Sequence, residues 1–205
     1  MYQTKLEVVN GCIATLGEQP LNSLDDEHVY KQAALDYLEA SNRRTQKPGL
    51  WFNSEFITLQ PDATSKYISV PQDAIRIERL PLDVRRFAQR GRRLYNLADN
   101  SFMWDYPMQV ALVRLIPFED VPFDGQDAIA LTAILRFQMV YDGDNARYQQ
   151  IDRDRARATT EMRAQNIREM DPNLLDTLSV VQKKFSLSPM TSLRGTRRIF
   201  ILPQR

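Results

Sequence analysis

The sequence predicts an α+β fold: a bundle of about four helices, an inserted antiparallel β subdomain and an extended C-terminal arm. Three observations lead to this prediction. Apolar residues recur at helical spacing on both sides of a central region, short β-branched and aromatic segments fill that region, and no regular period continues after about Val181. The expected parts are a first helical pair at 1–49, the β-rich insertion at 50–118, a second helical pair at 119–170 and the arm at 171–205.

The first helix is expected at residues 3–16, where apolar residues recur at spacings of three and four. Its stripe consists of Leu6, Val9, Ile13 and Leu16. Gly17 stands where a left-handed C-terminal cap is needed, and Pro20 prevents the helix from continuing.

The second helix is expected to begin near Ser23 or Asp25, because acidic residues are favourable in a first helical turn. The Lys47-Pro48-Gly49 sequence ends it. The expected buried stripe is Val29, Ala33, Tyr37, Ala40 and Ser41.

Five short segments after Leu50 are rich in aromatic and β-branched residues and are separated by proline or Asp-Asn turns. These expected strands are 51–59, 66–70, 75–80, 92–97 and 109–116. Ile75 and Ile77 alternate with Arg76 and Glu78, which predicts a sheet with one solvent-facing side.

The second helical pair is expected at 124–142 and from about Asp144 to Met170. Asp124 or Asp127 is the expected N-cap of the first of these helices, and Gly143 is its expected end. Its apolar face is expected to be Ile129, Ala133, Ile134, Phe137, Val140 and Tyr141. The last helix is densely charged, which is typical of a helix that faces water or a polar subunit surface. Its few apolar residues are Tyr148, Ile151, Ala158 and Met162.

Composition excludes several classes of protein. The chain has 205 residues, is 43% hydrophobic and carries a net charge of +1, so a general affinity for nucleic acid or membrane surfaces is not expected. Cys12 is the single cysteine, which leaves no intramolecular disulfide and no cysteine-based metal site. Neither a membrane-spanning run nor a signal peptide is recognised, so folding in a reducing cytoplasm is expected.

The arm is expected to dock on a neighbouring protein. Burial of its scattered apolar side chains at best offsets the backbone entropy that is lost on ordering the segment. These side chains are Phe185, Leu187, Met190, Leu193, Ile199, Phe200, Ile201 and Leu202. Six basic and two acidic residues give the arm a net charge of +4, so the preceding 170 residues sum to −3. Arg197 and Arg198 are its expected electrostatic contacts, although a solvated tail also explains such a charge pattern.

Catalysis is not expected from the motifs present. The glycines never fall into a nucleotide-binding spacing, and His28 is the single histidine, which is expected on a helix surface. No cofactor and no metal site are expected. A glycosidase needs only two carboxylates, and the candidate pairs are Glu119 with Asp120, Asp124 with Asp127, and Asp25 with Glu27. None of these pairs is convincing, because adjacent residues on strands point apart and capping explains acids at turns and helix starts. A sugar-stacking platform is conceivable from Trp51, Phe52, Phe102, Trp104 and Tyr106, but core packing is the commoner role of such residues.

Two blocks of the N-terminal third resemble a known family. Residues 9–21, VNGCIATLGEQPL, resemble the opening of tail tubular protein A, the head-to-tail adaptor of short-tailed phages. Trp51-Phe52-Asn53 followed by ITLQPD at 57–62 resembles a second block of that family, in the same order and spacing. Leu50 stands where the family has glycine before the tryptophan, and the later parts match in pattern only.

The resemblance implies a virion tail protein, made in the host bacterial cytoplasm, that assembles as a homo-oligomeric ring, with a dodecamer expected. The ring would bind the portal protein on one side and the tail nozzle, tail tubular protein B, on the other, with tail fibres near the nozzle junction. The genome would pass through the lumen. A secondary polysaccharide hydrolase activity is the alternative function.

A basic loop is the second expected contact surface. Its arginines are Arg85, Arg86, Arg90, Arg92 and Arg93, around an expected hairpin tip at Gly91. In a ring, repeated tips would face the translocating DNA or an acidic nozzle surface. A solvated loop that charge protects from aggregation is an equally good explanation.

Overall fold

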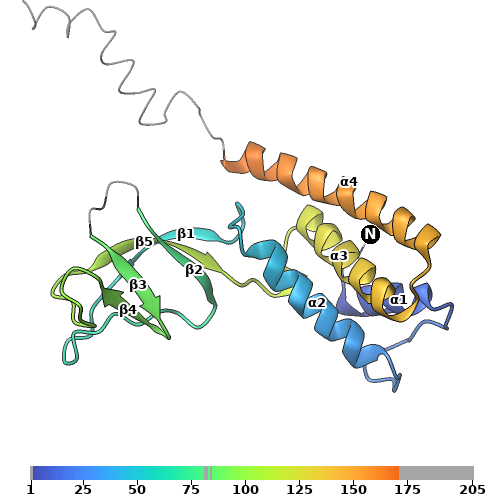
Figure 1. Cartoon of the computed structure of the whole chain (residues 1–205), viewed down its shortest axis with the longest axis horizontal. Coiled ribbons are helices and arrows are strands. Elements are labelled where there is room, and N and C mark those ends of the chain that lie inside the picture. Colours follow the sequence, from blue (N-terminus) through green and yellow to red (C-terminus); the bar gives the residue numbers. More distant parts are fainter. Residues whose placement is uncertain (1, 81–82, 84, 171–205) are drawn as a thin grey trace, which may run out of the picture. The chain divides into compact units, whose positions relative to one another are not determined.

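The computed structural model describes residues 2–80, 83 and 85–170, which form α-helices, a three-stranded sheet and a β-hairpin (Figure 1). The chain divides into two units, Met1–Asn166 and Ile167–Arg205. The helices and small antiparallel sheets confirm the predicted α+β class.

Helix α1 (Lys5–Thr15) begins at a capping box. Thr4 Oγ1 accepts the backbone N–H of Glu7 at 3.2 Å, and the Glu7 carboxylate accepts the backbone N–H of Thr4 at 3.1 Å. Backbone N–H groups of Gln3 and Thr4 donate to that carboxylate and lower its pKa. Gly17 has a φ of +75°, which confirms the left-handed position predicted after this helix.

Helix α2 (Lys31–Gln46) begins later than predicted. The acidic residues before it form a separate turn, in which Asp26 Oδ2 accepts the N–H of Ser23 at 3.0 Å and Ser23 Oγ accepts the N–H of Asp25 at 3.1 Å. These side chains satisfy the backbone amides without a helix, so the predicted start at Ser23 or Asp25 is wrong.

The buried face of α2 is also displaced from the predicted one. Its buried residues are Ala34, Leu38, Ser41, Asn42 and Gln46. Ser41 was predicted correctly, and Ala33 and Tyr37 are half-buried against the core. In contrast, Ala40 is exposed, and Val29 lies outside the helix with 89% of its surface exposed. The predicted stripe was counted from Val29, which does not share the helical period, so it drifted from the true core face.

The strands β1 (Ser54–Leu59), β5 (Met108–Arg114) and β2 (Ala74–Arg79) form an antiparallel sheet in that order. Strands β3 (Phe87–Arg90) and β4 (Arg93–Asn96) form a separate antiparallel hairpin. The antiparallel arrangement was predicted, but β3 was not.

The segment 66–70 is not a strand, although its composition predicted one. It makes only isolated bridges, from Tyr67 to Met103 and from Ser69 to Arg93. Asp62 Oδ1 accepts the N–H of Ser65 at 2.8 Å, and Lys66 follows with a φ of +60°. This turn forces the chain out of extended geometry immediately before the aromatic segment.

A 3-10 turn, η1 (Phe118–Asp120), leads to α3 (Phe123–Tyr141), and α4 (Asn145–Met170) follows. Pro122 is the N-cap of α3, so the caps predicted at Asp124 and Asp127 are wrong. Gly143 ends the helix with a φ of +72°, as predicted. The predicted core positions Val140 and Tyr141 are 61% and 41% exposed, so they lie at the edge of the core, where the Tyr141 ring still contacts that of Phe137 at 4.6 Å between centres.

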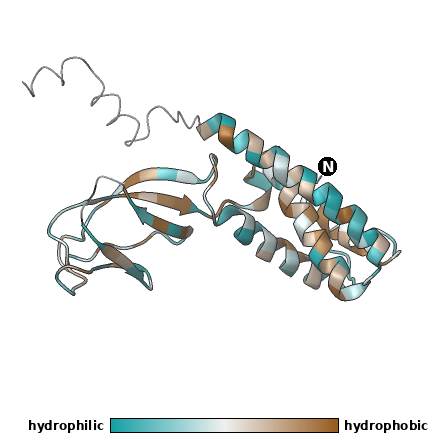
Figure 2. Cartoon of the chain, turned by 45° about the horizontal axis from the view of Figure 1, so that its top comes forward, coloured by the Kyte–Doolittle hydropathy of each residue, from teal (hydrophilic) through white to brown (hydrophobic). Residues whose placement is uncertain are grey.

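The main helical core lies among α1, α2 and α3, and it includes Val9, Ile13, Leu38, Ile129 and Phe137. A second apolar cluster fills the β region, around Trp104 and Val110. Helix α4 contributes only Ala158 and Met162 to a third cluster, with Leu50 and Ala128. Hydropathy colouring shows α4 as a mainly hydrophilic helix (Figure 2).

Candidate interaction surfaces

The β3–β4 hairpin places three of the predicted arginines at one tip. Arg90 pairs with Arg93 across the hairpin, and Gly91 and Arg92 form the turn between them. Gly91 has a φ of +62°, which glycine adopts without steric cost. The hairpin tip predicted at this glycine is therefore confirmed.

Two of these arginines lie over tyrosine rings. The Arg90 guanidinium carbon is 3.6 Å from the centre of the Tyr95 ring, and that of Arg93 is 4.6 Å from the centre of the Tyr67 ring. Phe102 contacts both tyrosines edge-on, with ring centres 5.0 and 6.2 Å apart. Stacking orders the guanidinium planes and leaves their N–H groups available to an anionic partner.

The other two arginines of the predicted loop do not join this surface in the same way. Arg85 forms a bidentate ion pair with Asp83, with its Nε at 2.8 Å and its second terminal nitrogen at 2.5 Å from the carboxylate oxygens. This guanidinium lowers the pKa of Asp83 to about 2. Arg86 is exposed just before β3. The charge of Arg85 is therefore already compensated.

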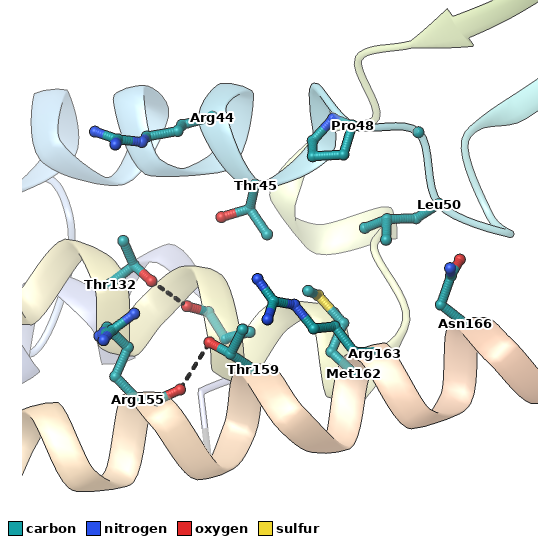
Figure 3. Close-up of a pocket in the computed structure, with 12 residues that line it drawn as sticks. Arg44, Thr45, Pro48, Leu50, Thr132, Arg155, Thr159, Met162, Arg163 and Asn166 are labelled. Carbon is teal, nitrogen blue, oxygen red and sulfur yellow. Dashed lines mark hydrogen bonds between the residues drawn. The ribbon is translucent and has the colours of Figure 1, made fainter.

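A second surface is a cleft of about 500 Å³ beside α4. Its apolar floor includes Leu50 and Met162, and its arginines are Arg44 from α2 and Arg155 and Arg163 from α4 (Figure 3). The four- and three-residue spacing of its α4 residues places them on one helix face. These α4 residues are Arg155, Thr159, Met162, Arg163 and Asn166.

Two hydroxyl groups of this cleft donate to carbonyls of their own helices. Thr132 Oγ1 donates to the carbonyl of Ala128 and Thr159 Oγ1 to that of Arg155, each at 2.7 Å (Figure 3). Arg155 pairs with Asp152 at 2.7 Å, whereas Arg44 and Arg163 form no ion pair with a carboxylate of the described residues. The cleft therefore presents uncompensated positive charge above an apolar floor.

Sequence reasoning did not identify this cleft. The spacing of Arg155, Thr159 and Arg163 on one face of the last helix is a visible signal, but it also fits a charged helix that faces water. Arg44 and Leu50 come from a distant part of the sequence. Helix α2 packs on α3, and Leu50 clusters with Ala128 of α3 and Met162 of α4, so only the tertiary structure brings these residues to the same place.

The residues considered for carbohydrate chemistry have other local contacts. Glu119 pairs with Lys5 at 3.3 Å, Asp127 accepts the backbone N–H of Tyr2 at 2.9 Å, and Asp25 lies in the turn with Ser23. The aromatic residues fall into separate ring contacts. These are Trp51 with Phe52, Phe102 with Tyr67 and Tyr95, and Trp104 with Tyr106. They do not form the single platform considered from the sequence.

His28 lies in the turn before α2 rather than on a helix surface. Its Nδ1 accepts the backbone N–H of Tyr30 at 3.2 Å, so Nε2 carries the proton that faces Glu18 Oε2 at 2.8 Å. Among the described residues, no three His, Cys, Asp or Glu side chains gather as a metal site. No helix within the described ranges is long and apolar enough to cross a membrane.

The predicted docking arm, which contains Phe185, Arg197, Arg198 and Phe200, lies outside the described residues. Its role stays a prediction from sequence.

Comparison with known proteins supports the resemblance seen in the N-terminal blocks. The family model described as tail tubular protein matches residues 6–172 of this chain. Tail tubular protein A of Klebsiella phage KP34 is 25% identical over 118 residues. That alignment covers 58% of this chain and 62% of the relative, so the chain spans about three fifths of the length of the relative it matches.

Proposed function

Because the chain belongs to the tail tubular protein family and is thus a structural component of the virion tail, we propose that it is a head-to-tail connector. In this proposal, twelve copies form a ring between the portal protein and the tail nozzle, and the ring seals the junction and conducts the genome. The name of the Klebsiella phage relative, tail tubular protein A, supports this more specific assignment.

The observation that carries the proposal is the character of α4. This helix is 26 residues long, yet Ala158 and Met162 are its only buried residues within the described range. A long helix with so little apolar burial usually presents its polar faces to solvent or to a partner. In a ring of identical copies, each copy would present such a helix to its neighbour, and ion pairs would contribute to the contact.

The arm at 171–205 supplies the proposed contact with the portal. Its net charge of +4 and its scattered apolar residues suit an extended segment that lies on another protein. Repetition around a ring turns a weak single contact into a strong multivalent one, because later contacts form at high effective concentration.

The hairpin tip with Arg90, Arg92 and Arg93 supplies the proposed contact with the nozzle or with DNA in the lumen. All three arginines are exposed, and none forms an ion pair with a carboxylate among the described residues. Their guanidinium groups, of which those of Arg90 and Arg93 lie over tyrosine rings, suit phosphates or acidic side chains, both of which accept two N–H bonds from arginine.

The experiment that tests the proposal is electron microscopy of this protein mixed with portal rings from the same particle. We expect an additional ring of matched symmetry on one face of the portal. Portal rings that remain bare, beside folded and unbound protein, would contradict the connector assignment.

A further inference from the structure

We propose that residues 25–29 of one copy dock in the arginine-lined cleft of the next copy, as the repeated contact of a head-to-tail ring. We call residues 25–29 the acidic turn and the cleft around Arg44, Arg155 and Arg163 the arginine cleft. The inference rests on the proposed function, because it assigns the surfaces by which identical copies contact each other.

The acidic turn is a preformed projection. Asp25, Asp26 and Glu27 are all exposed, and Val29 has 89% of its surface exposed. Lys31 Nζ donates to the backbone carbonyls of Leu24 at 3.0 Å and Asp26 at 2.8 Å, which holds the turn in place. An apolar side chain beside three carboxylates suits a contact that is apolar at its centre and charged at its rim.

The arginine cleft has the complementary chemistry. The cleft has a volume of about 500 Å³ and is lined in part by Leu50 and Met162, so it has room for one aliphatic side chain such as that of Val29. Arg44 and Arg163 can then form ion pairs with the carboxylates of the turn, because neither forms an ion pair with a carboxylate among the described residues. Guanidinium groups bind carboxylates with two parallel hydrogen bonds, which adds orientation to the charge attraction.

The turn cannot reach the cleft of its own copy. The turn precedes the N-terminal end of α2, and Arg44 and Leu50 lie at its C-terminal end. Sixteen helical residues separate the two ends by about 24 Å. Two different surfaces that bind each other between copies form a heterologous contact, and such contacts generate rings when the rotation closes.

The arm is a poorer occupant of the cleft than the turn is. Its net charge of +4 repels the uncompensated arginines, whereas the turn carries three acidic residues. Charge complementarity therefore favours the turn of a second copy.

Cysteine cross-linking in the full-length chain tests this contact. Cys12 is fully buried, and burial raises the pKa of its thiol to about 12, so it will not compete with engineered cysteines. Val29→Cys and Arg163→Cys are made in separate chains, which are mixed and treated with a short bis-maleimide, both at high concentration and after assembly on portal rings. We expect cross-linked dimers in the mixture and not from either variant alone.

The matched control replaces Arg163→Cys by Arg157→Cys, which places an exposed cysteine on the opposite face of α4. Equal cross-linking of both α4 positions, or none at Arg163→Cys in portal-bound rings, would overturn the docking contact while the connector function stands. If the protein does not bind portal rings, the connector function is refuted. The docking contact is then tested separately, by whether the free protein at high concentration forms the cross-link.

Charge exchange supplies a second test. Glu27→Arg and Arg163→Glu should each weaken self-association at least about tenfold, because each places like charges together. The double variant should recover most of the loss, since it restores opposite charges between copies. Additive losses in the double variant, measured by sedimentation at several concentrations, would overturn the pairing.

Discussion

The side chain of Asn53 joins the end of α2 to the sheet. It is 1% exposed, and its Nδ2 donates to the carbonyls of Gln46 at 3.1 Å and Arg114 at 2.9 Å. Its Oδ1 accepts the backbone N–H of Leu50 at 2.7 Å. One amide therefore satisfies buried backbone groups from three separate segments.

We predict that Asn53→Ala lowers the free energy of unfolding by about 3 kcal/mol, because buried backbone groups lose their partner. Urea unfolding followed by circular dichroism measures the change. The matched control is Asn145→Ala at an exposed position, which should change the free energy by less than about 0.5 kcal/mol. Equal effects at both positions would show that the buried amide has no special role.

The ion pair between Asp83 and Arg85 predicts a pH dependence of stability. The pKa of Asp83 is lowered to about 2 from its ordinary value, because the Arg85 guanidinium donates to the ionised carboxylate. A lowered folded-state pKa stabilises the protein above the ordinary pKa, and this contribution disappears as the pH falls toward the folded value. The midpoint of thermal unfolding should therefore differ between wild type and Asp83→Asn at neutral pH, and the difference should shrink between about pH 4 and about pH 2. A constant difference across this range would contradict the prediction.

At the scale of elements, Gly11 permits the close packing of α1 against α3. A Cβ atom at this position would lie 2.7 Å from Ile134 Cδ1 and 3.0 Å from Tyr2 Cε1. Overpacking costs about 1–3 kcal/mol, whereas replacing a helical glycine by alanine contributes about 1 kcal/mol of stability.

We therefore predict that Gly11→Ala lowers the free energy of unfolding by about 1 kcal/mol, despite the better helix propensity of alanine. Ile134→Val removes the Cδ1 atom that the new methyl group would meet. In that background, Gly11→Ala should cost less or become stabilising, as measured by a double-mutant cycle of urea unfolding. Strict additivity of the two changes would argue against the steric explanation.

We predict that the β3–β4 hairpin binds polyanions and that this binding weakens as the salt concentration rises. Replacing Arg90, Arg92 and Arg93 by serine should keep the fold, because these side chains are exposed, and should abolish a gel shift of duplex DNA at low salt. A control variant removes three exposed arginines elsewhere, at Arg43, Arg153 and Arg157. Absence of any shift with the wild-type chain at low salt would exclude DNA and leave an acidic nozzle surface as the partner.

At the scale of the whole molecule, we predict that the arm is needed for assembly but not for folding. Deleting 171–205 should leave a folded body with an unchanged unfolding midpoint, and it should abolish binding to portal rings in co-sedimentation. A full-length variant with Arg197→Ser and Arg198→Ser should bind more weakly, since it retains the apolar contacts but loses two charges. Unchanged portal affinity of the truncated chain would refute the docking role of the arm.

Much of the helical architecture could be predicted from patterns among neighbouring residues in the sequence. The apolar period of α1 and the glycines at 17 and 143 predicted helices and their ends, because helical spacing and positive φ values are properties of a few neighbouring residues. The blocks at 9–21 and 51–62 predicted the family, which the match over residues 6–172 confirms. The start of α2 was missed because Ser23 and Asp26 bond to backbone amides that a helix would also use.

The sequence by itself determined the class of fold, the ends of most helices, the hairpin tip at Gly91 and the family. Only the tertiary structure decided which residues form surfaces. The position of Arg90 over Tyr95 depends on strand register, and the cleft between Arg44 and Arg163 depends on how α3 and the segment at Leu50 pack against α4. The physical reason is range: local backbone preferences act within a few residues, whereas a binding surface forms only when packing brings distant residues together.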